Sequence, residues 1–152
     1  MQTLSDILTP GRTVCRATGG SKKRLFETIA RLISEDQQAL SYTEVFTQLI
    51  ARERLGSTGL GKGIAIPHCR IDNCPRPLGS LLTLEEAIDF EAPDGEPVDL
   101  LFVLLVPEEA QQVHLDILSH IAGLFRQDAF CQSLRQAEDA AALYATATTW
   151  TN

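Results

Sequence analysis

The chain has 152 residues, of which 44% are hydrophobic and 22% are charged, and its formal net charge at pH 7 is −7. This length and composition are typical of one globular domain and exclude a disordered or fibrous protein. The acidic balance argues against nucleic-acid binding, which needs clustered lysine and arginine to displace counterions. We therefore expect a single domain over residues 1–152 that binds no nucleic acid.

Cysteine usage indicates the compartment. The chain has 4 cysteines, and its first residues lack the charged and apolar regions of a secretory signal peptide. Free thiols in the cytoplasm are the better interpretation. The Cys69 and Cys74 pair has loose spacing and no second pair to complete a zinc site, so we expect no metal and no cofactor. The apolar run over 100–106 is far shorter than the roughly 20 residues of a membrane span, and predicts a buried strand without membrane insertion.

Helices dominate the expected elements of the N-terminal half. Ser21 is a good N-cap for the first long helix, whose apolar residues recur at helical spacing. A capping-box pattern begins the second helix, and Gly56 is expected to end it. The expected elements are a helical turn over 4–8, a strand over 12–17, a helix over 22–37 and a helix that begins after Ser41.

Strands and then helices are expected in the C-terminal half. The run over 98–106 is apolar on both faces, as expected of a central strand between layers of helices. Asp94 and Gly95 mark a turn before it. From Ala110 onward the pattern is helical, with Leu115, Leu118, Ile121, Ala122 and Phe125 on one face. The other expected elements are strands over 64–66 and 78–84 and short helices over 130–134 and 139–144. This order predicts a three-layer α/β/α domain with a mixed β-sheet flanked by helices.

The segment from Gly56 to His68 carries the strongest functional signal. Its glycines allow backbone N–H groups to turn toward one point, which makes an anion-binding nest. Pro67 then stiffens the chain and biases Ile66 toward extended backbone. A histidine beside such a nest suits phosphoryl transfer, because a neutral ring nitrogen attacks phosphorus while N–H groups bind the phosphate oxygens.

The same segment imitates a nucleotide-binding P-loop. Residues 56–62 match the pattern G-x-x-x-x-G-K, but Gly63 replaces the serine or threonine that binds magnesium. The order of elements is also reversed, since this loop follows a helix and precedes a strand. Nucleotide binding is therefore not expected.

The stretch from Arg52 to His68 resembles the active-site signature of the fructose/mannitol/nitrogen class of IIA proteins in the bacterial phosphotransferase system. The resemblance continues over 97–102 and 105–107, and reappears at His114-Leu115 and Leu118-Ser119. It covers nearly the whole chain. It implies a phosphotransferase component with a phosphohistidine intermediate.

Roles for individual residues follow from this resemblance. It implies that His68 is phosphorylated, that Arg52 stabilises phosphate charge, and that His114 lies close to His68. The residues implied to line the phosphate pocket are Ser57, Thr58 and Gly59. Without the resemblance, His68 and His114 would more often be structural histidines, and Arg52 would simply complement the helix dipole.

Cys69 departs from the family pattern, in which glycine usually follows the active histidine. A cysteine would be strained if the backbone there were left-handed. One hypothesis is that a positive local field favours the Cys69 thiolate and makes the site sensitive to thiol reagents. The alternative is an inert thiol that points into the core.

The resemblance is strongest to the nitrogen-regulatory branch, through residues 4–8 and 21–25 and the lack of a IIB domain before Asn152. It implies that a histidine phosphocarrier protein donates the phosphate. It also implies that the phosphorylation state controls target proteins, such as potassium-transport or sensor-kinase proteins. The alternatives are a free-standing fructose- or mannitol-type IIA component and an interaction module that takes no phosphate.

Overall fold

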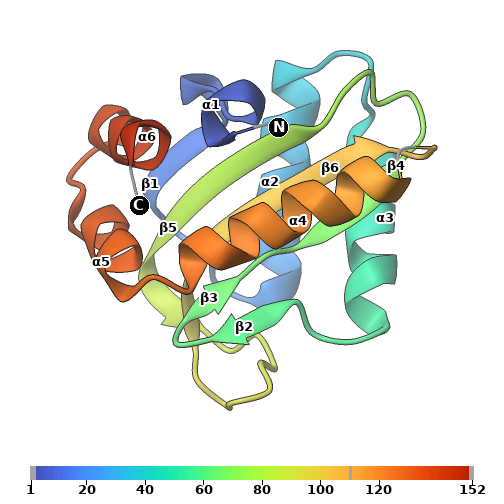
Figure 1. Ribbon diagram of the computed structural model, residues 1–152. Helices are drawn as coiled ribbons and strands as arrows, with labels where there is room; N and C mark the ends of the chain where they lie inside the picture. The colour runs from blue at the N-terminus through green and yellow to red at the C-terminus, as the bar shows by residue number, and fades with distance from the viewer. Residues whose placement is uncertain (1–2, 110, 151–152) are drawn as a thin grey trace.

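The computed structural model describes residues 3–109 and 111–150, which form helices on both faces of a β-sheet (Figure 1). The helical elements are α1 (Leu4–Ile7), the 3₁₀ turn η1 (Pro10–Arg12), α2 (Lys22–Asp36), α3 (Tyr42–Arg54), α4 (Gln111–Phe125), α5 (Asp128–Gln136) and α6 (Ala140–Thr149). The strands are β1 (Thr13–Ala17), β2 (Gly59–Gly61), β3 (Ile64–Ala65), β4 (His68–Ile71), β5 (Leu78–Ile88) and β6 (Val98–Pro107).

Within the described part of the chain, 6 strands form one mixed sheet in the order β1-β5-β6-β3-β2, and β4 also pairs with β6. Strand β5 runs antiparallel to β6, whereas β3 and β4 run parallel to it. Strands β3 and β4 lie end to end along the same edge of β6. Strand β3 pairs with Leu100 and Leu101, and β4 pairs with residues from Leu104 onward. Residues 66–67 separate them, which places the start of β4 at an edge of the sheet.

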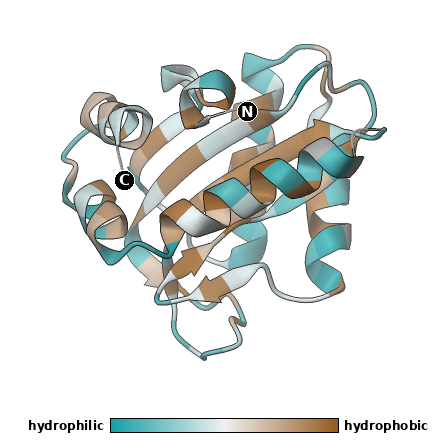
Figure 2. Ribbon diagram, viewed as in Figure 1, coloured by the Kyte–Doolittle hydropathy of each residue, from teal (hydrophilic) through white to brown (hydrophobic). Residues whose placement is uncertain are grey.

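Strand β6 is buried on both faces, as its sequence predicts. Leu101, Val103 and Leu105 pack with α2 and α3, whereas Phe102 and Leu104 pack with α1, α4, α5 and α6. Figure 2 shows hydrophobic colour along this central strand. The predicted three-layer α/β/α architecture is confirmed.

The caps of the long helices are confirmed as well. The Ser21 hydroxyl accepts a hydrogen bond from the Arg24 N–H, and the Ser41 hydroxyl accepts one from the Glu44 N–H. Each satisfies an N–H group that has no partner inside its helix. The structure thus begins α2 and α3 where the sequence places them.

Several helices and strands begin or end at other residues than the sequence predicts. Arg12 lies in η1 rather than in β1, because its buried guanidinium binds the carbonyls of Ile7 and Gly79 and the carboxylate of Asp36. Strand β5 continues to Ile88, and α5 and α6 are longer than predicted. The helix expected from Ala110 on is α4, and Ala110 itself lies outside the described residues.

The predicted face of α4 is wrong at one position. Leu115 is 60% exposed, and the buried face is formed by Ile117, Ile121, Leu124 and Phe125. The other residues of the predicted face, Leu118, Ile121, Ala122 and Phe125, do pack on this side, so the helical periodicity holds and only Leu115 is misplaced.

The glycine-rich segment contains the predicted strand β3 and, before it, the strand β2, which was not predicted from the sequence. Strands β2 and β3 form a hairpin whose loop is Lys62 and Gly63, with φ of 58° and 81°. A two-residue loop with both φ values positive matches the right-handed twist of its strands. These glycines therefore build a hairpin at the sheet edge.

Gly79 of β5 lies close against the buried Phe102 ring of the neighbouring strand β6. A Cβ atom at this position of β5 would lie 2.5 Å from Cζ of the buried Phe102 ring. Gly79→Ala should therefore lower the free energy of unfolding by about 1–3 kcal/mol through overpacking. Chemical denaturation followed by circular dichroism measures the change.

Gly123 provides the matched control in α4. A Cβ atom there meets nothing within 4 Å. Gly123→Ala should raise stability by about 0.5–1 kcal/mol, because alanine is the better helix former. Equal effects of the two substitutions would contradict the packing described for Phe102.

Candidate functional site

His68 is the first residue of the edge strand β4 and follows Pro67 directly. The Leu104 N–H of β6 donates a hydrogen bond of 2.9 Å to the Pro67 carbonyl, which fixes the chain just before the histidine. Alternation along β4 then buries Cys69 and Ile71 in the core beneath α2 and α3. The side chains of His68 and Arg70 lie on the opposite side of the strand from this core. Figure 1 shows β4 beside α3 and the start of α4.

One nitrogen of the His68 ring is committed to the backbone. Nδ1 lies 2.6 Å from the carbonyl oxygen of Ile66. A carbonyl oxygen only accepts hydrogen bonds, so Nδ1 must carry the proton. The lone pair of the neutral ring is then on Nε2, which makes Nε2 the nucleophilic nitrogen.

His114 lies in the first turn of α4 and faces His68. The ring centroids are 5.4 Å apart and the ring planes meet at 79°, an edge-to-face arrangement. The two histidines are separated by 46 positions in the sequence, and the packing of α4 beside β4 brings them together. Their proximity agrees with what the family resemblance implies.

Arg52 enters the same site from the last turn of α3. Its Nη1 donates a hydrogen bond of 2.9 Å to the Gly56 carbonyl, just beyond the helix end. A guanidinium has five N–H donors in a planar fork, so this contact leaves donors that suit the oxygens of a phosphoryl group.

These side chains surround an open cleft of about 690 Å³ between α3, β4 and the start of α4. Its positive groups, Arg52 and Arg70, stand out in a chain with a net charge of −7. Such a local positive field favours an anionic ligand. The lining residues are Gln48, Ala51, Arg52, Leu55, His68, Cys69, Arg70, Glu108 and His114.

Sequence reasoning missed Arg70 and Glu108 as cleft residues. The signal for Arg70 was available only once β4 was known, because residues two apart in a strand share a face. Glu108 follows the end of β6, and no sequence motif marks it.

Ser57, Thr58 and Gly59 do not line this cleft. The N–H and hydroxyl of Thr58 both donate to Glu53, at 3.0 and 2.7 Å. The Gly59 N–H donates to the Ser57 hydroxyl, which in turn donates to the Phe90 carbonyl. The donors expected to bind phosphate therefore have partners within the protein, and phosphate binding by these residues stays a prediction.

Both histidines are held neutral near physiological pH. Burial is the main cause that lowers the pKa of His68, and the Arg52 charge lowers it further against the opposing effects of the Ile66 carbonyl and Glu53. Burial is also the main cause that lowers the pKa of His114, and the neighbouring groups of His68, Arg70 and Arg52 lower it further. A neutral ring keeps a lone pair for nucleophilic attack.

Of the two interpretations of Cys69, the structure agrees with the inert thiol that points into the core. Its side chain is buried in the core, and burial, with a smaller effect of Cys74, raises its pKa to about 12. Its backbone lies in a strand and outside the left-handed region, so the strain expected for replacing glycine does not arise. The thiol is therefore protonated at physiological pH.

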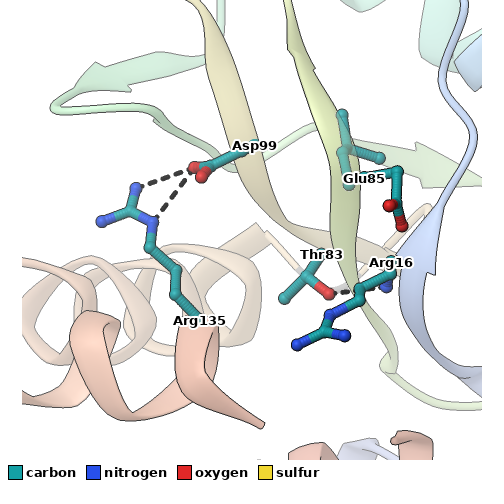
Figure 3. Close-up of a pocket in the computed structure, with 6 residues that line it drawn as sticks. Arg16, Thr83, Glu85, Asp99 and Arg135 are labelled. Carbon is teal, nitrogen blue, oxygen red and sulfur yellow. Dashed lines mark hydrogen bonds and ion pairs between the residues drawn. The ribbon is translucent and has the colours of Figure 1, made fainter. Parts of the chain in front are cut away.

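A second pocket, of about 250 Å³, lies between β1, β5, β6 and α5 (Figure 3). Arg135 donates to the Asp99 carboxylate at 3.1 and 2.9 Å, and the Arg16 N–H donates to the Thr83 hydroxyl at 2.8 Å. Because no histidine lines this pocket, the His68 cleft is the better candidate for chemistry.

Over residues 3–109 and 111–150, no group of three or more histidine, cysteine or acidic side chains is arranged to hold a metal ion. In the same ranges, no helix combines the length and apolar character needed to cross a membrane. All cysteines of the chain are free thiols.

Comparison with known proteins gives consistent matches over nearly the whole chain. Residues 6–148 match the family described as "Phosphoenolpyruvate-dependent sugar phosphotransferase system, EIIA 2". A nitrogen regulatory protein of Pseudomonas aeruginosa is 50% identical over 141 residues, which cover 93% of this chain and 92% of the relative. One of Escherichia coli K12 is 41% identical over 142 residues, covering 93% and 86%.

Solved structures agree with these sequence matches. The crystal structure of nitrogen regulatory protein IIA-Ntr from Neisseria meningitidis superposes with a TM-score of 0.88 at 44% identity, covering 95% of this chain and 99% of the other. The mannitol IIA structure from Escherichia coli gives a TM-score of 0.75 at 12% identity, covering 91% and 96%. This second likeness concerns the fold alone.

The electrostatics of the cleft predict how His68 titrates. Because burial and Arg52 lower its pKa, the midpoint should lie below the usual value of about 6.5, and the ring should charge only as pH falls through that lower midpoint. Arg52→Gln removes a positive charge and should raise the midpoint. NMR titration of the imidazole signals, assigned with His114→Gln and His120→Gln variants, measures both. A midpoint above 6.5 in the wild type would contradict the buried environment.

The burial of Cys69 predicts slow reaction with thiol reagents. In the folded protein, alkylation should modify the half-buried Cys15 well before Cys69, because attack needs an exposed thiolate. Peptide mapping by mass spectrometry after brief treatment distinguishes the positions, and unfolding in denaturant should make both reactive. Equal rates at Cys69 in the folded and unfolded states would show that the thiol is accessible.

Proposed function

Since the chain belongs to the EIIA 2 family of the phosphoenolpyruvate-dependent sugar phosphotransferase system, and within it to the nitrogen regulatory proteins, we propose that it carries a phosphoryl group on Nε2 of His68. The observation that carries the proposal is the His68 ring itself: Nδ1 is hydrogen-bonded to Ile66, and the ring shares a cleft with His114 and Arg52. A histidine fixed by one nitrogen presents the other for reaction.

The proposed donor is a phosphorylated histidine phosphocarrier protein. The Nε2 lone pair attacks phosphorus, the N–P bond of the donor breaks, and its electron pair stays with the donor imidazole. Positive charge develops on the His68 ring as the new N–P bond forms. The Ile66 carbonyl stabilises that charge through the Nδ1 proton, since hydrogen bonding to a charged form favours it. We expect no cofactor in this step.

Arg52 and His114 are proposed to support the transfer without being phosphorylated. The planar guanidinium of Arg52 binds two phosphoryl oxygens at once, which stabilises charge in the transition state. His114 is within reach of a phosphoryl group on His68, since the rings are 5.4 Å apart at their centroids. Its N–H then donates a hydrogen bond to a phosphoryl oxygen.

The surface around the cleft suits contact with a protein donor. Leu55 lines the cleft and is 85% exposed, and Leu115, next to His114, is 60% exposed. Large apolar side chains beside a charged site are typical of protein interfaces, where they supply buried area around specific polar contacts. We assign these leucines to the docking of the phosphocarrier.

A regulatory role is proposed by analogy with the relatives. They bear the name nitrogen regulatory protein, and we propose by analogy that the phosphorylation state of His68 controls target proteins in the cytoplasm. Potassium-transport and sensor-kinase proteins are the classes proposed as targets. Transfer of phosphate to a purified IIB domain would instead favour a free-standing fructose- or mannitol-type component.

A labelling experiment tests the proposal. The wild-type protein, His68→Ala and Arg52→Lys are each incubated with phosphorylated histidine phosphocarrier. Intact-mass spectrometry should show one added phosphoryl group on the wild type and none on His68→Ala. Arg52→Lys should acquire the group roughly a hundredfold more slowly, because lysine cannot form the two-point contact.

Circular dichroism of each variant verifies that the fold is retained. Equal labelling of the wild type and His68→Ala would overturn the assignment of His68. A wild type that takes no phosphate from either a nitrogen-branch or a sugar-branch carrier would favour the interaction module.

A further inference from the structure

Both donors of Thr58, in the glycine-rich segment, bind the Glu53 carboxylate rather than facing the cleft. We propose that Glu53, bound by Lys22 and Thr58, is a positioning residue that holds Arg52 in place beside His68. This inference rests on the proposed function, and it gives Thr58 a role in fixing the site instead of contacting phosphate.

Glu53 is a buried carboxylate with a full set of partners. Its residue is 9% exposed. Oε1 accepts the Thr58 hydroxyl at 2.7 Å, and Oε2 accepts the Thr58 N–H at 3.0 Å and pairs with Lys22 Nζ at 2.8 Å. A buried charge is tolerated only when it is paired and hydrogen-bonded in this way. The arrangement therefore has one well-defined geometry.

The contacts of Glu53 determine where Gly56 lies. Thr58 is tied to the carboxylate, and the Gly56 N–H donates to the backbone carbonyl of Glu53 at 3.2 Å. The chain between them is thus folded back onto the end of α3. The Gly56 carbonyl is then in position to accept the hydrogen bond of 2.9 Å from Arg52 Nη1. In this way Glu53 fixes the acceptor that orients its neighbour Arg52.

Lys22 connects this arrangement to a distant part of the chain. It is the first residue of α2, and its Nζ donates to the Phe90 carbonyl at 3.1 Å and lies 4.5 Å from the Phe90 ring centroid. The Ser57 hydroxyl donates to the same carbonyl at 3.2 Å. The segment after α3 is therefore held from both sides, by Glu53 and by the backbone at Phe90.

The glycine at position 59 fits this interpretation. A Cβ atom there would lie 2.8 Å from the Cβ of Ala92, which is closer than real Cβ contacts occur. Gly59 therefore allows the segment to pass close to the chain around Phe90, where the Ser57 contact is made. Close approach of backbone is a use of glycine that needs no bound anion.

Thr58→Val tests the positioning role with little change of shape. The variant loses the hydroxyl contact to Glu53, so the Gly56 carbonyl and Arg52 are held less firmly. The single-turnover transfer rate at saturating phosphocarrier should fall on the order of tenfold or more, since small misplacement of a catalytic group is costly. The half-saturating carrier concentration should not change, and Thr58→Ser, which keeps the hydroxyl, should restore most of the rate.

A second readout does not depend on phosphorylation. The Arg52 charge helps to lower the pKa of His68, so displacement of Arg52 should raise the His68 titration midpoint of the unphosphorylated protein in Thr58→Val. If Thr58→Val fails to fold, Lys22→Gln is the second variant, because it removes the ion pair between Lys22 and Glu53. It should likewise slow the transfer and raise the His68 midpoint.

Thr83→Val is the matched control. Thr83 is 6% exposed, close to the 5% of Thr58, and its hydroxyl accepts a hydrogen bond of 2.8 Å from the Arg16 N–H away from the cleft. It should lower thermal stability without altering the transfer rate or the His68 midpoint. The inference is overturned if Thr58→Val behaves like Thr83→Val. It is also overturned if Thr58→Ser is as slow as Thr58→Val. A wild type that takes no phosphate would instead reject the proposed function, while the titration still reports on Arg52.

Discussion

The hydrogen bond between Nδ1 of His68 and the Ile66 carbonyl decides which ring nitrogen is available for chemistry. It spans only two residues, so its geometry depends on the backbone of Ile66 and Pro67. Proline fixes its own φ and keeps the preceding residue extended. The Pro67 carbonyl is held in turn by the Leu104 N–H of β6, a strand buried on both faces. The His68 ring is thus oriented through a backbone that is tied to the buried central strand of the sheet.

Charge balance in the cleft follows from burial and from Arg52 and Arg70. In the unphosphorylated protein these effects keep both histidines neutral, because each lowers the pKa of an imidazole. A phosphoryl dianion on His68 would reverse the local field. The opposite charge of a nearby phosphoryl group would favour the protonated form of His114 and so raise its pKa, against the effect of burial. We expect His114 to bind a proton more readily after transfer, which makes it a better hydrogen-bond donor to the phosphoryl group.

The sequence predicts those parts of the fold that local chemistry decides. Ser21 and Ser41 mark helix starts because their hydroxyls bind N–H groups three residues on, and the apolar run of β6 indicates a strand covered on both faces. Leu115 was misplaced because several apolar faces of α4 satisfy the same periodicity, and only packing chooses between them. The partners of Thr58 were also not predictable, because Glu53 lies five residues away across a helix end whose geometry depends on Lys22. The meeting of His68 with Arg52 and His114 was implied by the family resemblance and not by any local pattern.

An edge strand is a liability in a soluble protein, since its unpaired backbone groups can pair with another chain. Strand β4 pairs with β6, is only 4 residues long, follows a proline and presents the charged side chain of Arg70. These are the features that protect sheet edges from further pairing.

The same features of β4 also position the residues of the candidate site. The proline precedes His68 directly, and Arg52 from α3 lines the same cleft. The alternation of side chains directs Cys69 into the core while His68 and Arg70 reach the cleft. An edge position also leaves His68 beside an open cleft, which the proposed transfer from a protein donor requires, whereas a central strand covered by helices would bury it.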